Sequence, residues 1–307
     1  RGLFPGLTVS DLTYEAKEAP TIMETIVNIF PSNIIKPFAD ASMLQVIVAS
    51  LFFGFAIILV GEKAQPFASF VESVNEVCMK IMEMIIALSP IGVFCLITPV
   101  VAENGPQILG TLTIVLLAAY IGYILQAVLV YSTTVKAMGG VGIRDFFKGM
   151  GPAMMMAFSS ASSVGTLPLN LECSEKLGAR KDIAAFTLPL GATINMGGTA
   201  IYQGVCSLFI ASCFGVTLTM PQMLTIIFTA TLASVGTAGV PSAGMIMLAM
   251  VLQSVGLPVE GIALVAGVDR IFDMGRTTIN ITGDAACAVV VSKMEDRKVA
   301  RTKSVLG

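Results

Sequence analysis

The sequence predicts an all-α polytopic membrane protein with two re-entrant helical hairpins and broken helices. The composition predicts a membrane protein, because 55% of the 307 residues are hydrophobic and only 12% are charged. Soluble domains carry about 25% charged residues. The second part rests on apolar segments that are interrupted near their centres by glycine, serine, proline or asparagine. Such interruptions at membrane depth are tolerated only where the backbone is buried in protein or lines a cavity.

Two features of the composition exclude classes of function. The sequence contains no histidine, which is the commonest metal ligand and general base, so neither a zinc site nor a catalytic triad is expected. The six cysteines form no CxxC pair and most of them lie in apolar runs, so we interpret them as small buried side chains.

The first part of the chain is expected to hold interfacial segments and one transmembrane helix. Residues 1–40 contain four prolines and five acidic residues, which favours short interfacial helices and loops. Residues 41–60 carry no charge and are long enough to span a bilayer. The sequence opens with neither methionine nor a signal peptide, so we expect an excised or incomplete part of a longer protein.

Two further spans are expected before residue 150. Residues 67–102 form a long segment that Ser89 and Pro90 interrupt, which predicts a kinked helix. We interpret the charges in its first half as a ladder on a helix that emerges from the membrane. They are Glu72, Glu76, Lys80 and Glu83. Residues 107–135 form an uninterrupted third span, which basic residues follow.

Three later segments are apolar at both ends and polar or glycine-rich in the middle. Residues 150–175 and 222–255 hold SSASSVGTLP and GTAGVPSAG at their centres. A re-entrant hairpin, unlike a spanning helix, places its least helical residues there. Residues 183–214 contain NMGGT at 195–199, which predicts a helix broken to expose backbone carbonyls. Each glycine-rich tip taken alone also fits close helix packing through small residues.

Residues 261–292 form an apolar segment with one polar face. Its polar side chains recur every three or four residues, and at roughly 100° per residue they share an arc of about 80°. They are Asp269, Asp273, Arg276, Asn280 and Asp284, with Thr277 at the border. A charge at membrane depth costs about 2.5–3.5 kcal/mol on insertion scales, so these side chains need partners, water or ions. A buried structural pair of Asp273 and Arg276 leaves the other members unexplained, and we favour a polar ligand site.

The order of these segments indicates an inverted-repeat secondary transporter. A hairpin and a broken helix are followed by a second hairpin and the ligand-bearing helix, and paired interrupted segments point to such a repeat. Lysine and arginine gather in the loops at 136–148 and 176–181 and in the tail. Three other connections contain none: 103–106, 215–221 and 256–260. If the basic side is cytoplasmic, the first hairpin enters from inside and the second from outside.

Four short segments resemble the signature segments of the dicarboxylate/amino acid:cation symporter family, which has the glutamate transporter fold. They are SSVGTLP (162–168), GATINMGGTAIYQG (191–204), ASVGTAGVPSAG (233–244) and DMGRTTINITGD (273–284). The resemblance runs from about residue 25 to residue 292. It implies eight transmembrane helices, two re-entrant hairpins and a homotrimer when full length, with about the first three helices missing here.

On this basis we expect four parts. They are the remaining scaffold part with interfacial segments and one transmembrane helix (1–66), two helices linking scaffold and transport parts (67–149), the transport core (150–292) and a basic cytoplasmic tail (293–307). The core is expected to carry substrate across the membrane by alternating access.

The resemblance implies a binding site for an acidic amino acid. By position, Arg276 would pair with the side-chain carboxylate, which suits a planar guanidinium, and Thr199 would add a hydroxyl. Asp273 would accept the α-ammonium group, with Thr277 beside it. Asn280 and the backbone at Ser163 would hold the α-carboxylate. Ser162 in the first tip would also bind the substrate. The second tip, with Val240, Pro241 and Gly244, would close over the ligand as the extracellular gate.

The resemblance also implies sodium as the coupling ion and no organic cofactor. Unwound backbone carbonyls and hard side-chain oxygens suit sodium. The first site would comprise Gly191, Asn195, Asn280 and Asp284. The second would form mostly through carbonyls, and only with the gate shut, at Thr193, Ser234, Val235 and Thr237. That geometry would couple ion binding to substrate binding.

The sequence departs from the family at places that bear on function. Gly197 stands where amino-acid carriers commonly have an aspartate that binds a further sodium, so that ion is expected to be lost or weakly bound. Gln203 stands where relatives that countertransport potassium have glutamate, which argues against potassium antiport. Ala161 stands where some members place an arginine, a charge that Arg276 supplies here. Arg270 has no functional account from the sequence.

We therefore predict a sodium-coupled symporter of aspartate or glutamate in the plasma membrane, in contact with lipid and without a nucleic-acid partner. A sodium- or proton-coupled carrier of C4 dicarboxylates or neutral amino acids is the nearest alternative, which Asp273 and Arg276 disfavour. A different class is an intramembrane aspartyl protease using Asp273 and Asp284, but its GxGD motif would need glycine in place of Ile281. No enzymatic activity is expected.

Overall fold

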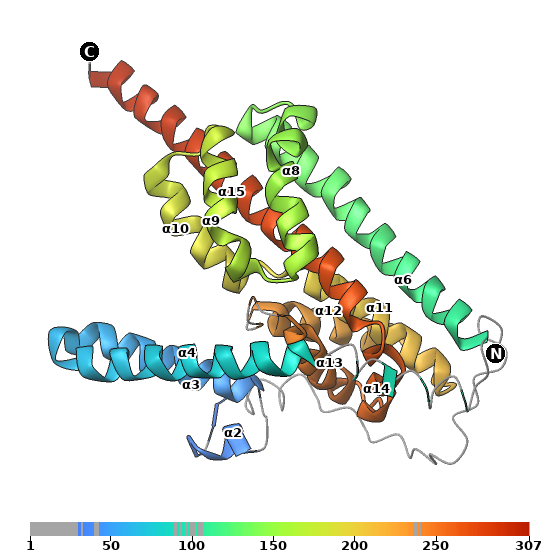
Figure 1. The fold of residues 1–307 in the computed structure, drawn as a ribbon. Helices are drawn as coiled ribbons and strands as arrows, with labels where there is room; N and C mark the ends of the chain where they lie inside the picture. Colours follow the sequence, from blue (N-terminus) through green and yellow to red (C-terminus); the bar gives the residue numbers. More distant parts are fainter. Residues whose placement is uncertain are drawn as a thin grey trace.

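Every regular element that the computed structural model describes is a helix (Figure 1), which confirms the predicted all-α class. The described residues are 30–31, 33–39, 43–88, 107–235, 237, 239 and 241–306, with five single positions between 91 and 102. Most of the interfacial region predicted for residues 1–40 and the kink predicted at Ser89 and Pro90 lie outside these residues.

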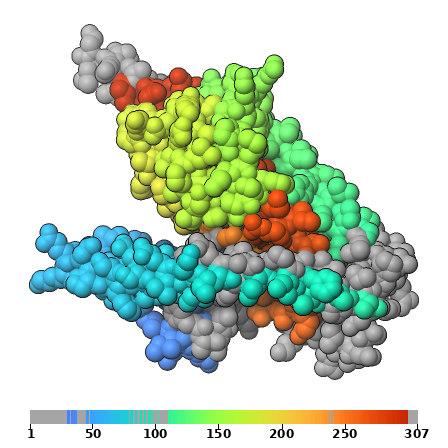
Figure 2. All heavy atoms as spheres, in the orientation of Figure 1, coloured from blue at the N-terminus to red at the C-terminus, as the bar shows by residue number. Residues whose placement is uncertain are grey.

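The first long helices fold back on each other. After the short helix α2 (Lys36–Ala39), α3 (Met43–Val60) confirms the helix predicted over residues 41–60. The turn η1 (Gly61–Ala64) joins it to α4 (Gln65–Ala87), and the rings of Phe53 and Phe67 stack at 6.0 Å across the pair. Most apolar side chains of α3 and α4 are exposed, and Figure 2 shows the pair (blue to teal) along one face of the molecule. Such a surface is expected for helices that lie against lipid or other helices.

A long helical rod occupies the predicted third span. It begins with α6 (Gln107–Leu125) and continues through η2 (Gln126–Tyr131), α7 (Ser132–Thr134) and η3 (Val135–Gly139), of which η2 and η3 are π-helical. The rod ends at Gly140, whose φ of 69° is left-handed and unstrained for glycine. By length and composition, three stretches of the described helices are long and apolar enough to cross a membrane: Val48–Cys78, Gly110–Gly139 and Lys181–Cys213. The first includes the reversal at η1 and the third includes the break between α10 and α11, so neither is one straight helix.

Two helical hairpins occupy the predicted positions. α8 (Ile143–Ser160) and α9 (Ser163–Lys176) reverse direction at residues 161–162. α12 (Met220–Val235) and α13 (Ala243–Ser254) are joined by residues 236–242. Both reversals fall on the serine- or glycine-rich centres of the segments predicted as hairpins. That each hairpin enters and leaves the membrane on one side stays a prediction.

The predicted broken helix is present, whereas the polar segment 261–292 is not one continuous helix. α10 (Lys181–Ile194) and α11 (Gly197–Cys213) are separated by two residues of the NMGGT segment. η4 (Val259–Gly261) and α14 (Ile262–Ala266) are followed by a turn at residues 267–268, after which α15 (Asp269–Leu306) begins. Asp269 therefore starts a helix, where a negative charge is favourable next to the positive end of the helix dipole.

α15 is the central helix of the body formed by the helices after residue 107. It contacts α6, η2, η3 and α8 to α11, and Figure 1 shows it (red) crossing the middle of this group. Because so many elements surround α15, the polar face predicted on it is enclosed by protein.

The loops rich in lysine and arginine meet at one end of this body. The backbone N–H of Arg180 donates to Ser292 Oγ at 2.9 Å, and a β-carbon on Gly140 would lie 3.8 Å from the side chain of Lys293. At the other end, a β-carbon on Gly261 would lie 3.1 Å from Phe214, so the connections at 215–221 and 256–260 are neighbours. This placement agrees with the two sides predicted from charge, although the connection at 103–106 lies outside the described residues.

Candidate substrate and ion site

The two hairpin tips touch each other beside the break between α10 and α11. The carbonyl oxygen of Gly239 accepts hydrogen bonds from the Ser162 hydroxyl at 3.1 Å and from the Val164 N–H at 3.2 Å. A β-carbon on Gly239 would lie 2.7 Å from the carbonyl oxygen of Ala192, so the absence of a side chain permits this approach. The tips and the end of α10, which are distant in sequence, thus form one cluster.

The first tip is shaped by its own residues. Ala161 adopts a left-handed φ of 54°, and Ser162 then caps α9, because its hydroxyl oxygen accepts the Gly165 N–H at 3.0 Å. The Thr166 hydroxyl donates to the Ser162 carbonyl at 2.7 Å. The positive N-terminal end of α9 therefore lies beside the site at Ser163, as the predicted role of its backbone requires.

The polar face of α15 is buried, as predicted. Its members are each at most 4% exposed: Asp269, Asp273, Arg276, Thr277, Asn280 and Asp284. Asp269 stands apart at the start of the helix, and neither of its carboxylate oxygens has a hydrogen-bond partner in the described part of the chain. The other members contact the hairpin tips, the helix break or one another.

Arg276 and Asp273 form a buried ion pair. Arg276 Nε and Nη2 lie 2.6 Å and 2.5 Å from Asp273 Oδ1, and Arg276 Cζ lies 5.0 Å from the centre of the Tyr202 ring. Arg276 Nη1 has no hydrogen-bond partner among the described residues. The pair considered above as a structural alternative is therefore formed, and the ligand roles of both residues stay predictions.

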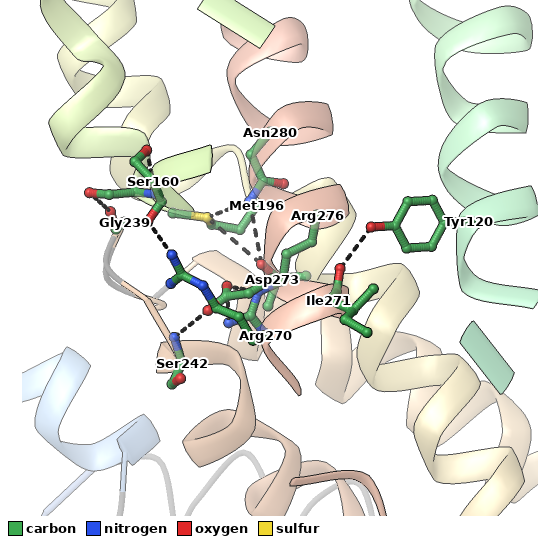
Figure 3. A network of polar contacts seen from close by, with 12 residues as sticks. Tyr120, Ser160, Met196, Gly239, Ser242, Arg270, Ile271, Asp273, Arg276 and Asn280 are labelled. Atoms are coloured by element: carbon green, nitrogen blue, oxygen red, sulfur yellow. Dashed lines mark hydrogen bonds and ion pairs between the residues drawn. The ribbon is translucent and has the colours of Figure 1, made fainter. Parts of the chain in front are cut away.

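The second hairpin closes onto this pair. The Ser242 N–H donates to Asp273 Oδ2 at 2.5 Å, and Figure 3 shows Ser242 pointing to Asp273 from below. A β-carbon on Gly244 would overlap Arg276 Nη1. Any larger residue at position 244 would therefore displace either the Arg276 guanidinium or the start of α13.

A small polar cavity lies where the tips, the helix break and α15 meet. It has a volume of about 10 Å³ and is lined by Ser163, Met196, Thr199, Thr237, Gly239, Asp273, Arg276, Thr277 and Asn280. A volume of this size holds about one water molecule. An amino acid therefore needs the surrounding elements to move apart before it can enter.

Asn280 connects the cavity to the helix break. Its Oδ1 accepts the Gly198 N–H at 2.8 Å, while its amide N–H groups point to Met196 Sδ at 2.9 Å and Thr199 Oγ1 at 3.4 Å. Gly198 is required here, because a β-carbon would lie 2.5 Å from the Arg276 carbonyl oxygen. The break thus lies directly on the backbone of α15.

The structure brings together the residues predicted for the first sodium site. The Asn195 amide donates to Asp284 Oδ1 at 2.8 Å and to the Asn280 carbonyl at 3.3 Å. A β-carbon on Gly191 would overlap Asp284 Oδ1, so this carboxylate lies against the backbone of α10. Asp284 Oδ2 is buried without a hydrogen-bond partner among the described residues. An oxygen free to face a cation fits the predicted sodium ligands.

The residues predicted for the second sodium site are not joined by side-chain contacts. Ser234 and Thr237 are buried, but their hydroxyls donate to Thr231 and Ala233 in their own segment. Thr193 is exposed and bonds the Leu190 carbonyl, and Val235 is 43% exposed. The prediction rested on backbone carbonyls, and it stays a prediction.

Six predicted substrate residues line the cavity, and the others lie at its edge or outside the described residues. The six are Ser163, Thr199, Asp273, Arg276, Thr277 and Asn280. Ser162 holds the tips together, Gly244 abuts Arg276, and Pro241 lies in the turn before α13. Val240 is outside the described residues. Sequence reasoning did not assign Met196 to the cavity, although its place inside NMGGT could have indicated it.

Arg270 also acquires a place in the structure. Its Nη2 donates to the carbonyl oxygens of Ser159 at 3.1 Å and Ser160 at 3.3 Å, and Figure 3 shows the guanidinium reaching the first tip from α15. These carbonyls end α8 and carry the negative end of its dipole. Arg270 therefore fastens the first tip to α15, which its sequence neighbours gave no reason to expect.

A polar cavity between two hairpin tips and a broken helix, enclosed by apolar helices, defines the site of a secondary transporter. The chain belongs to the sodium:dicarboxylate symporter family, whose family model matches residues 5–294. This confirms the family resemblance found in the four signature segments.

Several transport proteins are identical to this chain at about a third of the aligned positions. The chain is 32% identical over 283 residues to the proton/sodium-glutamate symport protein of Bacillus subtilis (strain 168). The aligned region covers 92% of this chain and 66% of that relative. The chain is also 34% identical over 292 residues to the proton/glutamate-aspartate symporter of Escherichia coli (strain K12), covering 93% and 67%. The chain is 38% identical over 242 residues to excitatory amino acid transporter 2 of Homo sapiens. That aligned region covers 78% of this chain and 42% of the relative. The chain thus spans about two thirds or less of the length of these relatives.

Proposed function

We propose that the protein is a sodium-coupled symporter of acidic amino acids that works by alternating access in the plasma membrane. Family membership and the names of the relatives support this proposal. The single observation that carries the choice of substrate is the buried pair of Arg276 and Asp273 at the wall of the cavity.

An acidic amino acid can replace each partner of this pair by a ligand group of the same charge. Its side-chain carboxylate takes the place of Asp273 on Arg276, where the unpartnered Nη1 offers a further donor. Its ammonium group takes the place of Arg276 on Asp273. Because a buried charge without a partner is strongly destabilising, the exchange is favourable only if the ligand carries both charges.

This argument disfavours the nearest alternatives. A neutral amino acid would supply no distal carboxylate for Arg276, and a C4 dicarboxylate would supply no ammonium group for Asp273. An aspartyl protease needs two carboxylates at one place. Asp273 instead contacts Arg276 and Ser242, whereas Asp284 contacts Asn195. The relatives named above are transport proteins.

The second hairpin acts as the gate. Its tip bonds Asp273 through Ser242, and the cavity is too small for an amino acid while this contact is made. Loss of the contact frees Asp273 for the ligand and opens the cavity. The connections at 215–221 and 256–260, which lead into and out of this hairpin, lie at the end of the body without lysine or arginine loops, which supports an extracellular gate.

Asn280 couples ion binding to substrate binding. Its side chain lines the cavity, while its carbonyl accepts the Asn195 amide that also bonds Asp284. When bound, sodium supplies a positive charge beside Asp284, Asn195, the Asn280 carbonyl and the Gly191 backbone. The bound ion would thereby hold Asn280 in the position in which its side chain binds the α-carboxylate of the substrate.

The family resemblance supports assembly as a homotrimer when full length. The exposed apolar face of α3 and α4 provides surface for lipid or for neighbouring subunits.

Uptake by the intact protein in proteoliposomes tests the proposal. An inward sodium gradient is expected to drive accumulation of radiolabelled aspartate or glutamate, and excess succinate or serine is expected to compete weakly. Potassium in place of sodium serves as the control for the ion. Accumulation of succinate in preference to aspartate, uptake independent of sodium, or cleavage of a membrane peptide would contradict it.

A further inference from the structure

Two tyrosines of the α6–η2 rod lie against two glycines of α15. Tyr123 and Tyr131 are eight residues apart, and so are Gly275 and Gly283. A β-carbon on Gly275 would lie 2.8 Å from the Tyr123 ring, and one on Gly283 would lie 2.6 Å from the Tyr131 hydroxyl. The first contact is next to Arg276 in sequence and the second is next to Asp284, so one tyrosine faces each half of the polar helix face.

The hydroxyl of Tyr131 is buried beside the first ion site. Tyr131 is 7% exposed, and its hydroxyl makes no hydrogen bond within 3.5 Å among the described residues, although the Gln126 amide lies close to it. The Asn195 amide lies as close as this hydroxyl to the β-carbon position of Gly283, at 2.6 Å, and it donates to Asp284. Two buried oxygens without partners, Tyr131 Oη and Asp284 Oδ2, therefore flank the same stretch of α15.

Leaving such groups unpaired is unfavourable. A buried polar atom without a partner costs about 1–3 kcal/mol, and more if it is charged. Tyr120 on the same helix shows the usual solution, because its hydroxyl donates to the Ile271 carbonyl at 2.8 Å (Figure 3). Within the described part of the chain, Tyr123 and Tyr202 also have buried hydroxyls without a partner, but only the Tyr131 hydroxyl lies beside the stretch of α15 that holds the unpartnered Asp284 Oδ2. This combination points to a ligand shared by the two oxygens.

The π-helical turn of the rod explains how Tyr131 reaches this place. In an α-helix, residues five apart such as Gln126 and Tyr131 would point about 140° away from each other. Both nevertheless face the start of α11, since a β-carbon on Gly197 would lie 3.6 Å from Tyr131 Oη and 3.9 Å from Gln126 Nε2. Gln126 and Tyr131 are the first and last residues of η2, and such turns are frequent at functional sites.

We infer that Tyr131 is a further determinant of the cation site at Asp284, with its hydroxyl supplying a neutral oxygen ligand from the side where Gly197 has no side chain. The inference deepens the proposed function and rests on its ion coupling. One carboxylate surrounded by neutral oxygens matches a monovalent cation, because sites for divalent cations use more carboxylates or retain several waters.

Replacing Tyr131 by phenylalanine removes the oxygen and leaves the ring against Gly283. Tyr123→Phe is the matched control, since Tyr123 is also buried, on the same rod and without a hydroxyl partner among the described residues. In the intact purified protein, the sodium concentration for half-maximal thermal stabilisation is measured without substrate. The sodium concentration that gives half-maximal aspartate binding is measured in a second experiment.

The Tyr131→Phe variant is expected to need at least threefold more sodium in both measurements, and Tyr123→Phe is expected to need the same sodium as the unmodified protein. A merely structural role would lower the melting temperature without sodium and leave the sodium dependence unchanged. An unchanged sodium requirement in Tyr131→Phe, or an equal increase in both variants, overturns the inference alone. If sodium affects neither stability nor binding of the unmodified protein, both the inference and the proposed coupling fail.

Discussion

The two hairpin tips meet at one cavity but are attached to α15 in different ways. The first tip is fastened by Arg270, which bonds the last carbonyls of α8, and by the cap that Ser162 provides for α9. The second tip reaches α15 through the Ser242 N–H on Asp273. Only the second attachment uses a residue that the proposed ligand also needs.

In the proposed mechanism, this difference separates a fixed tip from a gate. A ligand that takes over Asp273 competes with the bond from Ser242, so the position of the second tip depends on what occupies the cavity. Arg270 lies outside the residues that line the cavity, so the first tip can keep its place during the same exchange. The tips still touch through Gly239, which lets the gate close against a fixed partner.

The largest effect is expected from removing the charge that both ligand and gate depend on. Arg276→Cys leaves Asp273 buried without its cation, a loss of about 3–5 kcal/mol. Aspartate binding to the intact protein, measured by calorimetry in saturating sodium, is therefore expected to weaken more than 100-fold. Arg276→Lys keeps the positive charge but lacks the planar guanidinium. Its aspartate affinity is expected to lie between those of the unmodified protein and Arg276→Cys. Aspartate affinity within about threefold of the unmodified protein, ~0.7 kcal/mol, would refute the assigned role.

The main features of this architecture could be predicted because their signals are local. The length of an apolar run, its interruption by serine, glycine or proline, and a repeat of three or four residues define spans, hairpins, the helix break and the polar face. Six of the ten predicted substrate residues consequently line one cavity. The start of α15 at Asp269 was missed because Gly267 and Val268 continue an apolar run without any polar signal.

Contacts to the backbone and between distant side chains were beyond the sequence. Arg270 bonds carbonyls about 110 residues earlier in the chain, and a carbonyl has no residue type by which it could be recognised. The π-helical turn that places Tyr131 beside Gly283 is likewise a feature of hydrogen bonding rather than of composition. The pairing of Arg276 with Asp273, by contrast, could be considered from the sequence, because residues three apart on a helix are neighbours.

A smaller effect is expected where the two tips meet. Gly239→Ala places a β-carbon 2.7 Å from the Ala192 carbonyl and 3.1 Å from Ser163 Cβ, so the second tip must move away from the first. Substrate affinity is expected to fall about tenfold because closure is weakened, while a cysteine-reactive probe reaches a reporter cysteine at Ser163 faster. Gly204→Ala is the matched control, since nothing lies within 4 Å of a β-carbon there. Equal probe rates in both variants would mean that the tips do not need this contact to close.

The smallest effect is expected at the first tip, where Arg270 bonds the end of α8. Arg270→Met keeps a long aliphatic side chain but removes the donor to Ser159 and Ser160. Hydrogen bonds from charged groups contribute about 1.5–3 kcal/mol, and the partial exposure of Arg270 reduces this through solvent screening to about 1 kcal/mol. We therefore expect a melting temperature lower by a few degrees and faster hydrogen exchange at residues 159–162. Because Arg270 touches neither the cavity nor Asp284, the sodium requirement is expected to stay within twofold. If Arg270→Met weakened aspartate binding as strongly as Gly239→Ala, the first tip would also move with the ligand, and the distinction between a fixed tip and a gate would be wrong.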